Sequence, residues 1–588
     1  MVHTVRILRG TFLSRTIPAR KAQKKIRTGG SGGEMKDLLR DLVRKALESC
    51  CADGTLTSGQ IPAVLIEIPA HAEHGDFATN VAMLMAKTEK KSPRVVAESL
   101  VRHLEGSSGI FARVEVAGPG FINFTIKDEA WRKTLLAVCE AGADYGKSLV
   151  GKGKRVQVEF VSANPTGPLH IGHGRGAATG DAIASILAAA GFEVIREYYI
   201  NDAGNQMNTL GLSIFLRYRE LLGEMTEFPE NCYQGDYIRD IARDALTKYG
   251  DRFFKATEEE GIAFFAKLGG DIILKGIDDD LCRFGVRFDT WYSEQSLFDS
   301  GKVSSAISFM REKGLIYEGD GALWFKTTDF GDDKDRVVVR SNNVTTYFAS
   351  DIAYHMEKFE RGFDWVVDVW GADHHGYVPR LKGVVAGLGR SPDDLKIVLV
   401  QLVALLRDGV PVAMSTRSGE FVTLKEVVDE VGRDAARFFF LMRRSDSQLD
   451  FDLELAKRQS TDNPVYYVQY AHARICSVFE NAAERGFVPP DPQDAPLARL
   501  ETPEEMAIIK ELAVFPEVVE GSALSFEPHR ITYYLQELAG QFHSFYNKNR
   551  VITEDRELTG ARLFLLQCVA VTLKNALTIL GVSAPEKM

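Results

Sequence analysis

Two histidines, His170 and His173, stand three residues apart in a glycine-rich loop, between a strand-like run at residues 156–160 and a helical pattern at residues 181–190. At the start of a helix, free backbone N–H groups and the helix dipole favour phosphate. Imidazole rings, neutral or protonated, also donate hydrogen bonds to phosphate oxygens as negative charge builds on them. The alternatives are that the histidines cap the helix or bind a metal ion. Their place after a strand and before a helix favours phosphate chemistry and no metal.

The loop that carries these histidines is polar and rich in glycine, but it lacks the Gly-Lys-Ser/Thr sequence of a Walker loop. Gly172, Gly174 and Gly176 would permit the close approach of an adenine or a ribose. A second strand is expected at residues 193–200. The pattern therefore predicts a βαβ unit whose loop lies at the carboxyl end of the first strand, where doubly wound sheets bind ligands.

The length of 588 residues corresponds to roughly four domains of about 150 residues each. Hydrophobic residues make up 45% and charged residues 26% of the chain, which argues against a disordered or fibrous protein. The most apolar segment, residues 563–580, is interrupted by Gln567, Lys574 and Asn575. We therefore expect no transmembrane helix and no membrane partner.

The net charge of −10 is distributed unevenly. Residues 1–34 carry +7, which leaves −17 on the remainder. This basic extension has three interpretations: a transit peptide, an arm that binds nucleic acid, or a linker or early start site before Met35. The acidic total does not exclude nucleic acid, because binding needs a basic patch and not a basic protein.

The seven cysteines are odd in number and include no Cys-x-x-Cys pair. This usage predicts reduced thiols in a cytoplasmic enzyme, with neither a disulfide framework nor a zinc site.

Four regions are expected along the chain. Residues 1–34 are a basic extension, disordered or not translated, and residues 35–150 form an α+β domain. Residues 151–462 form a Rossmann-type, doubly wound α/β domain with a charged helical insertion at about residues 205–300. Residues 463–588 form an all-α domain.

The His-Ile-Gly-His sequence resembles the signature of class I aminoacyl-tRNA synthetases, which use a Rossmann catalytic domain. The sequence around it, Val-Glu-Phe-Val-Ser-Ala-Asn-Pro-Thr-Gly at residues 158–167, resembles arginyl-tRNA synthetases in particular. Further stretches resemble that family in the same order along the chain: residues 75–80, 118–123, 347–354, 371–375, 463–474 and 580–588. The resemblance covers residues 35–588, and it implies an ATP-dependent enzyme that attaches L-arginine to tRNA(Arg).

Carried over by motif, the resemblance implies two sets of ligand-binding residues. The arginine-binding set comprises Glu159, Ser162, Asn164, His170, Tyr347, Asp351, His374 and His375. The ATP-binding set comprises His170, Gly172, His173, Gly371, Asp373, His374, Met414 and Ser415. A guanidinium needs a planar, bidentate acceptor, so carboxylates in the arginine-binding set suit the substrate. Helix capping by Asp351 and core packing of Tyr347 are the structural alternatives.

The second signature of this class, Lys-Met-Ser-Lys-Ser, departs from its usual form. Here Ala413 and Thr416 stand in place of the two lysines. Some arginyl enzymes that lack these lysines carry a lysine shortly before the histidine motif, but Gly167 occupies that position here. Our hypothesis is that Arg417, with Ser415 and Arg407, supplies the positive charge, because arginine stays charged and chelates phosphate oxygens. The catalytic set is therefore His170, His173, Ser415 and Arg417.

The resemblance implies that the arginine carboxylate attacks the α-phosphate of ATP, with Mg²⁺ on the phosphates, and that the 2′-hydroxyl of the tRNA's terminal adenosine then takes the arginine. Arginyl enzymes generally need bound tRNA for the first step. Basic and aromatic residues suit unstacked RNA bases, and the expected tRNA contacts are Phe121, Asn123, Tyr466, Tyr470, Arg474, Tyr546 and Asn547. For each single aromatic residue, core packing is the alternative. We expect a monomer in the cytoplasm.

Three other functions fit parts of the sequence. Another class I synthetase, such as a cysteinyl enzyme, would show zinc-ligand cysteines near the site. A pantothenate-synthetase-like enzyme or nucleotidylyltransferase would not need the helical tail of roughly 120 residues. A non-enzymatic, tRNA-binding paralogue is supported only by the missing lysines. The residues that weigh against it are Glu159, Asn164, His170, His173 and Asp351.

Overall fold

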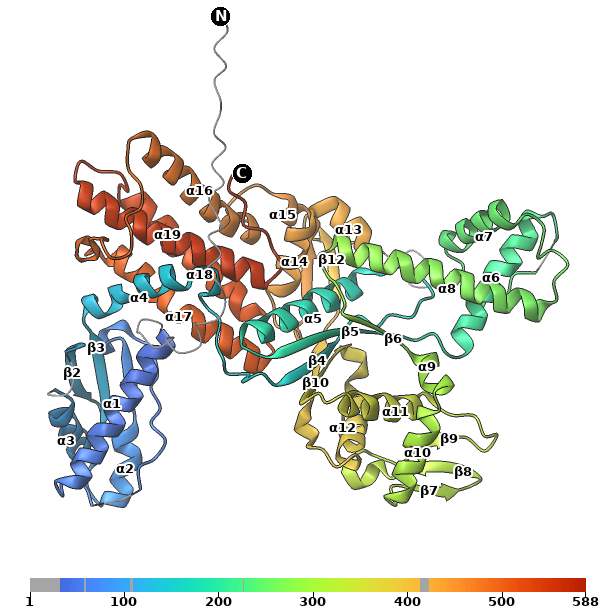
Figure 1. Cartoon of the computed structure of the whole chain (residues 1–588), viewed down its shortest axis with the longest axis horizontal. Coiled ribbons are helices and arrows are strands. Elements are labelled where there is room, and N and C mark those ends of the chain that lie inside the picture. Colours follow the sequence, from blue (N-terminus) through green and yellow to red (C-terminus); the bar gives the residue numbers. More distant parts are fainter. Residues whose placement is uncertain (1–31, 58–59, 106–108, 226, 413–421) are drawn as a thin grey trace, which may run out of the picture. The chain divides into compact units, whose positions relative to one another are not determined.

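The computed structural model describes residues 32–57, 60–105, 109–225, 227–412 and 422–588 (Figure 1). Residues 1–31 of the expected basic extension therefore lie outside the described residues. The chain divides into two compact units, Met1–Ala137 and Val138–Met588. The division falls inside the helix α4 (Asp128–Ala141).

The first unit packs helices on one three-stranded antiparallel sheet, as the α+β prediction expected. Its strands are ordered β1 (Phe77–Thr79), β3 (Phe121–Ile126) and β2 (Phe111–Ala117). The helices are α1 (Gly32–Ala52), α2 (Val81–Glu89) and α3 (Pro93–Glu105). A strand-like run at residues 64–68 forms only an isolated bridge, between Glu67 and Ala78.

Several motif residues of this unit serve the fold itself. Gly75 has a φ of +88°, and a Cβ there would lie 2.6 Å from the carbonyl oxygen of Phe124, so only glycine fits. Asn123, expected to contact tRNA, lies within β3 and its side chain is only 5% exposed. Phe121, at the start of the same strand, is partly exposed. Phe121 is therefore partly accessible to solvent, whereas Asn123 is not.

The second unit is built on a five-stranded parallel sheet. The strand order is β11 (Leu395–Val400), β10 (Trp365–Gly371), β4 (Arg155–Glu159), β5 (Glu193–Ile200) and β6 (Thr290–Ser293). The chain order reverses between β4 and β10, which makes this pair the switch point of a doubly wound sheet. Ligands bind at the carboxyl ends of such strands.

The helical insertion follows β5 and comprises α6 (Asn205–Leu221), α7 (Asp236–Tyr249) and α8 (Glu258–Arg283). It ends before the expected boundary near residue 300, because residues 290–293 form β6 and pair in parallel with β5. A strand of four residues inside a charged segment leaves little periodic signal, which explains the difference.

The second half of the sheet is preceded by a smaller layer. Helices α9 (Glu294–Asp299) and α10 (Lys302–Glu312) lead into an antiparallel sheet of β7 (Ile316–Gly319), β8 (Ala322–Phe325) and β9 (Arg336–Val339). Helix α11 (Tyr347–Glu360) precedes β10 in the chain, and the 3₁₀ helix η4 (Ala372–Tyr377) connects β10 to α12 (Val378–Gly387). Their buried apolar residues form one core with this layer.

A small mixed sheet follows, with the order β13 (Val410–Pro411), β12 (Val403–Arg407) and β14 (Leu449–Asp452). Helices α13 (Leu424–Val431), α14 (Arg433–Leu441) and α15 (Leu453–Lys457) accompany it. The C-terminal part is helical, as expected, with α16 (Pro464–Glu484), α17 (Pro503–Ser525), α18 (His529–Lys548) and α19 (Arg556–Ile579).

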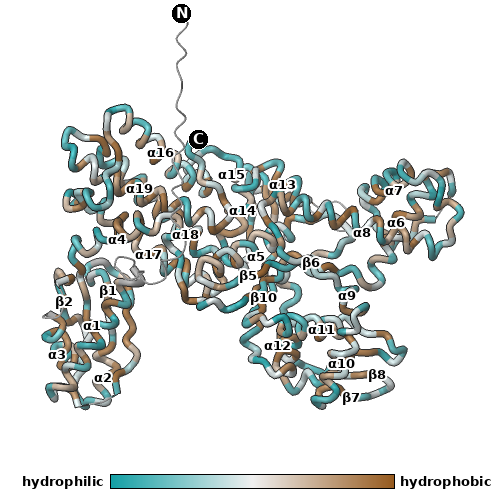
Figure 2. The backbone as a smooth tube through the Cα atoms, in the orientation of Figure 1, coloured by the Kyte–Doolittle hydropathy of each residue, from teal (hydrophilic) through white to brown (hydrophobic). Residues whose placement is uncertain are grey.

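Helix α19 is the one described helix that is long and apolar enough to cross a membrane by length and composition alone (Figure 2). However, 61% of its apolar stretch is buried inside the unit. The Asn575 side chain donates hydrogen bonds to the carbonyl oxygens of Gly142 and Tyr145, at 2.8 and 3.0 Å. These contacts are those of a core helix in this structure.

Candidate functional site

The two signature histidines begin helix α5 (Ile171–Ala189) and cap it reciprocally. His170 is the N-cap residue, and its Nδ1 accepts from the backbone N–H groups of Gly172 and His173. The Nδ1 of His173 accepts from the backbone N–H of His170 at 3.3 Å. The rings stack with centroids 3.7 Å apart. The capping interpretation is therefore confirmed, and it is compatible with phosphate binding.

This capping arrangement fixes the chemical form of both rings. Because each Nδ1 accepts a backbone hydrogen bond, a neutral ring carries its proton on Nε2. Burial, with the neighbouring His170, lowers the pKa of His173 to about 3, and burial also lowers the pKa of His170. Both imidazoles are therefore neutral at pH 7 and present Nε2–H donors rather than positive charge.

The glycines around the histidines have separate roles. A Cβ on Gly172 would lie 2.9 Å from the His170 ring, so glycine at this position permits the cap. A Cβ on Gly174 would lie 2.6 Å from the Leu424 side chain, so Gly174 gives room to α13 and not to a nucleotide, contrary to the sequence interpretation. At Gly176 nothing lies within 4 Å of the Cβ position.

The second signature falls on residues 413–421, so Ala413, Met414, Ser415, Thr416 and Arg417 lie outside the described residues. The residues directly after it are tied to the histidine motif. Leu424 N–H donates to the Leu169 carbonyl at 2.8 Å, and Ile171 N–H donates to the Val422 carbonyl at 3.2 Å.

Arg407, before the second signature, is held by Glu430 and Glu454. These ion pairs occupy the guanidinium of Arg407, which argues against the role in phosphate binding that the sequence predicted for it.

An acidic cavity of about 450 Å³ opens at the carboxyl ends of β4, β5 and β10, at the switch point of the sheet. Four carboxylates line it, from Glu159, Glu294, Asp351 and Asp368. Tyr199, Tyr354 and Tyr377 contribute aromatic walls. A cavity of this kind suits a small cation with a flat shape.

Most of the residues predicted to bind arginine line this cavity: Glu159, Ser162, Tyr347, Asp351 and His374, together with Gly371 from the ATP-binding set. Tyr347 is 58% exposed at the start of α11, which contradicts core packing. Asp351 lies in the second turn of that helix, where Thr346 is the N-cap, so helix capping is also wrong for it.

Several of the described residues predicted to bind arginine or ATP are not part of the cavity wall. Asn164 accepts a hydrogen bond at 2.9 Å from Asn201, which does line it. His375 is exposed and its Nδ1 contacts the Ala372 carbonyl at 3.1 Å. Asp373 is exposed beside His374, 3.6 Å away. His170, expected in both sets, lies on the α5 side of the switch point and is not part of the cavity wall.

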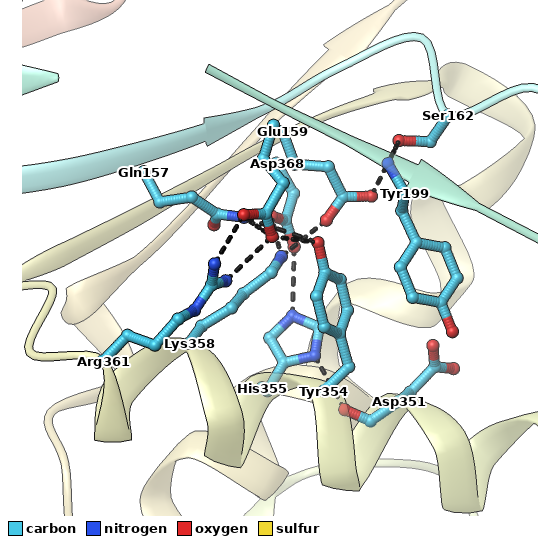
Figure 3. A network of polar contacts seen from close by, with 11 residues as sticks. Gln157, Glu159, Ser162, Tyr199, Asp351, Tyr354, His355, Lys358, Arg361 and Asp368 are labelled. Atoms are coloured by element: carbon cyan, nitrogen blue, oxygen red, sulfur yellow. Dashed lines mark hydrogen bonds and ion pairs between the residues drawn. The ribbon is translucent and has the colours of Figure 1, made fainter. Parts of the chain in front are cut away.

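Two of the carboxylates share a buried lysine (Figure 3). The Nζ of Lys358 lies 2.6 Å from Oε2 of Glu159 and 2.9 Å from Oδ1 of Asp368. Burial raises the pKa of Asp368, but Lys358 and His355 outweigh that effect and hold the pKa at about 2. Burial raises the pKa of Glu159 although Lys358 opposes the shift.

Sequence reasoning missed Glu294, the first residue of α9 directly after β6. Its side chain is 3% exposed, and its Oε2 has no hydrogen-bond partner among the described residues. Burial, with the charges of Asp351 and Asp202, raises its pKa to about 7. The short run Thr290–Ser293 before an acidic residue was the available signal, because ligand-binding residues follow parallel strands.

The loop that leaves β4 stores backbone strain. Val161 and Ser162 have φ values of +68° and +40°, in the left-handed region that β-branched and other non-glycine residues rarely adopt. Ser162 holds this turn, since its Oγ donates to Glu159 at 3.1 Å and accepts from the Tyr199 N–H at 3.1 Å. The strain therefore sits at the edge of the acidic cavity.

A second cavity, of about 580 Å³, lies among the C-terminal helices. Its lining includes four of the residues predicted to bind tRNA, Tyr470, Arg474, Tyr546 and Asn547. Arg485, Lys548 and Arg550 add positive charge, and none of the described residues that line it is acidic. Arg474 stacks between Tyr470 and Tyr546, at 4.9 and 4.7 Å from their ring centroids. Tyr466 stacks on Tyr470 at 5.8 Å but lines a neighbouring cavity.

Comparison with known proteins gives three matching families. The family described as tRNA synthetases class I (R), catalytic domain, matches residues 137–452. The arginyl tRNA synthetase N-terminal domain matches residues 37–126, and the DALR anticodon binding domain matches residues 468–588. The parallel sheet, the helix that begins at the paired histidines and the first of these matches define a class I tRNA synthetase catalytic domain.

Comparison with individual proteins shows which family of class I synthetases the chain belongs to. The chain is 74% identical to the arginine–tRNA ligase of Citrifermentans bemidjiense and 63% identical to that of Syntrophotalea carbinolica, each over 94% of this chain and 100% of the relative. The Thermus thermophilus arginyl-tRNA synthetase shares the fold, with a TM-score of 0.73 and 23% identity over 94% of this chain and 100% of that one. The chain belongs to the arginyl-tRNA synthetase family.

Proposed function

We propose that this chain is an arginine–tRNA ligase, which activates L-arginine with ATP and transfers it to the terminal adenosine of tRNA(Arg) for protein synthesis. The observation that carries the proposal is the acidic cavity at the switch point, where Glu294 has an unpartnered, buried carboxylate oxygen next to Asp351. The guanidinium of arginine supplies the donors and the charge that this pair needs. The identity to curated arginine–tRNA ligases supports the same function.

The first reaction needs no nucleophile from the enzyme. An oxygen of the arginine carboxylate forms a bond to the α-phosphorus of ATP, and the bond to the pyrophosphate leaving group breaks. The Nε2–H groups of His170 and His173 donate to phosphate oxygens as their negative charge grows. Met414, Ser415 and Arg417 remain our candidates for contacts to the β- and γ-phosphates.

The described residues contain no group of three His, Cys, Asp or Glu side chains arranged to hold a metal ion. We place Mg²⁺ on the phosphate oxygens of ATP, as the family resemblance implies, where it would neutralise charge during the transfer.

The second reaction transfers arginine from the adenylate to the tRNA, and AMP leaves. The basic cavity among the C-terminal helices is our candidate for the anticodon, because stacked aromatic and arginine side chains suit unpaired bases. We assign residues 35–150 to the tRNA elbow, through Phe121, residues 151–462 to catalysis and residues 463–588 to the anticodon. We further propose a cytoplasmic monomer.

The test is ATP–pyrophosphate exchange with each of the twenty amino acids, with and without total tRNA. Exchange only with arginine, and only with tRNA present, is the expected result. Exchange with another amino acid would refute the assignment of the cavity. No exchange at all, with tRNA still bound, would favour a non-enzymatic tRNA-binding protein.

The pKa of Glu294 predicts how arginine binding depends on pH. Guanidinium pairing needs the ionised carboxylate, and this group has a pKa of about 7 in the free protein. Below pH 7 binding must therefore remove a proton, and the Kd for arginine should rise up to about tenfold per pH unit. Above pH 8 the Kd should be constant. Glu294→Gln should bind arginine weakly and without this dependence.

Calorimetric titration of arginine between pH 5.5 and 8.5 measures this effect. Glu312→Gln, at an exposed position on α10, is the matched control and should follow the wild type. A Kd for the wild type that does not change between pH 6 and 8 would contradict the assignment of Glu294.

The stacked arginine of the C-terminal cavity predicts a defect confined to tRNA. Arg474→Ala removes one cation and opens the stack with Tyr470 and Tyr546, so the KM for tRNA should rise about tenfold while the KM for arginine is unchanged. Arg556→Ala is the control, since that exposed arginine also stacks on a ring, Phe487, outside this cavity. Aminoacylation kinetics measure both constants. Equal effects of the two substitutions would exclude the C-terminal cavity as a tRNA-binding site.

A further inference from the structure

We propose that Lys358 is a positioning residue for arginine selectivity: by holding Glu159 and Asp368 in a buried ion-paired cluster, it leaves Glu294 and Asp351 as the two carboxylates that receive the guanidinium. This inference rests on the proposed function, because it takes arginine as the substrate.

Lys358 lies behind the cavity and not in it. Its side chain is fully buried, and it is absent from the cavity wall that Glu159 and Asp368 help to form. Its Nζ contacts those two carboxylates and lies 4.3 Å from the centre of the Tyr354 ring. Figure 3 shows it rising from α11 toward the ends of β4 and β10, so it reaches the substrate only through these partners.

Every oxygen of the two paired carboxylates already has a donor. Glu159 accepts from Lys358 on Oε2 and from Ser162 on Oε1. Asp368 accepts from Lys358 on Oδ1, and its Oδ2 lies 3.1 Å from Nε2 of His355. The other ring nitrogen of His355 faces the Asp351 carbonyl at 2.8 Å, so the ring lies between Asp368 and the backbone of α11.

The other two carboxylates of the cavity are placed differently. Oε2 of Glu294 has no partner among the described residues, and Asp351 accepts one hydrogen bond, from the Tyr377 hydroxyl. These two groups come from α9 and α11, whereas the paired ones come from β4 and β10. A guanidinium with five N–H donors can meet both of these carboxylates, neither of which has a cationic partner in the contacts above, and a compact ammonium group does this less well.

Loss of the lysine should therefore change selectivity as well as rate. Without Lys358, the carboxylates of Glu159 and Asp368 form a buried like-charge pair, and Glu159 becomes an acceptor inside the cavity. A single free carboxylate is enough to pair with the compact ammonium group of lysine. The new acceptor should therefore increase the affinity for lysine more than the affinity for arginine. Arginine also gains a second binding position, in which its carboxylate is not aligned with the α-phosphate of ATP.

The experiment compares wild type, Lys358→Met, Lys358→Arg and the double variant Lys358→Met/Glu159→Gln in tRNA-dependent exchange with arginine and with lysine. For Lys358→Met we expect kcat/KM for arginine to fall about 100-fold, the arginine-over-lysine ratio to fall at least tenfold, and the KM for ATP to stay within about threefold. Lys358→Arg should stay near wild type, and the double variant should recover most of the selectivity because it removes the released acceptor.

A purely structural role would lower the melting temperature without changing the ratio between the two amino acids, and an unchanged ratio in folded Lys358→Met overturns the inference. If that variant does not fold, the double variant decides: restored folding and selectivity support the inference, and a folded protein with poor selectivity overturns it. Failure of wild-type exchange with arginine would refute the proposed function and this inference together, whereas normal wild-type exchange with unresponsive variants refutes the inference alone.

Discussion

Asp351→Asn should reduce arginine-dependent pyrophosphate exchange by about 10²- to 10³-fold in kcat/KM. The carboxylate lies in the cavity and is desolvated, so that burial raises its pKa, and it accepts a hydrogen bond from the Tyr377 hydroxyl. Removing one partner of a buried charge pair costs about 3–5 kcal/mol, because the other charge stays unpaired. Here the unpaired charge would be the guanidinium of the substrate. The loss should appear mainly in the KM for arginine.

Steady-state exchange at saturating tRNA, with arginine and ATP varied separately, measures this effect. Asp393→Asn is the matched control, since Asp393 is an exposed residue of the 3₁₀ helix η5 (Pro392–Asp394), outside the cavity. The KM for ATP should not change in either variant. An Asp351→Asn enzyme with a normal KM for arginine would show that the guanidinium binds elsewhere.

The sequence was most informative where local pattern decides structure. The run at residues 193–200 forms β5 with the same bounds, because it is a largely apolar segment that follows a turn signal. The prediction that the histidine motif lies at a helix start was also correct, because the residues next to the motif decide where the helix begins. The doubly wound sheet followed from these segments, since a βαβ unit has few alternative arrangements.

The sequence was least informative where contacts between residues far apart in the chain decide which side chains are buried. Glu294 lay in a charged stretch, and the run Thr290–Ser293 before it, which forms β6, is too short to give a clear periodic signal. Lys358 stands between Glu357 and Glu360 in the chain, and no motif in the sequence singled it out, yet it is completely buried. Asn123 and Gly174 were assigned to ligands by motif, and both serve packing. Burial of a charge depends on elements distant in sequence, so periodicity cannot reveal it.

The capping geometry of the histidines gives a prediction that separates their structural from their catalytic role. His173→Asn keeps an acceptor near the position of Nδ1, so the hydrogen bond from the His170 N–H can persist, but it removes the Nε2–H donor. His173→Gln does the reverse, because its longer amide reaches toward the position of Nε2. We expect the Asn variant to lose about 10²- to 10³-fold in kcat for exchange, the cost of removing one donor to a charged transition state.

The Gln variant should lose less activity and more stability than the Asn variant, because it gives up the cap and keeps a donor. Exchange kinetics and thermal unfolding of the same preparations measure the two effects side by side, with the KM for arginine as an internal control that neither substitution should move. Equal losses of activity in both variants would show that His173 acts only through the helix start. A fully active Asn variant would show that the phosphate is stabilised by the free N–H groups of α5 without this ring.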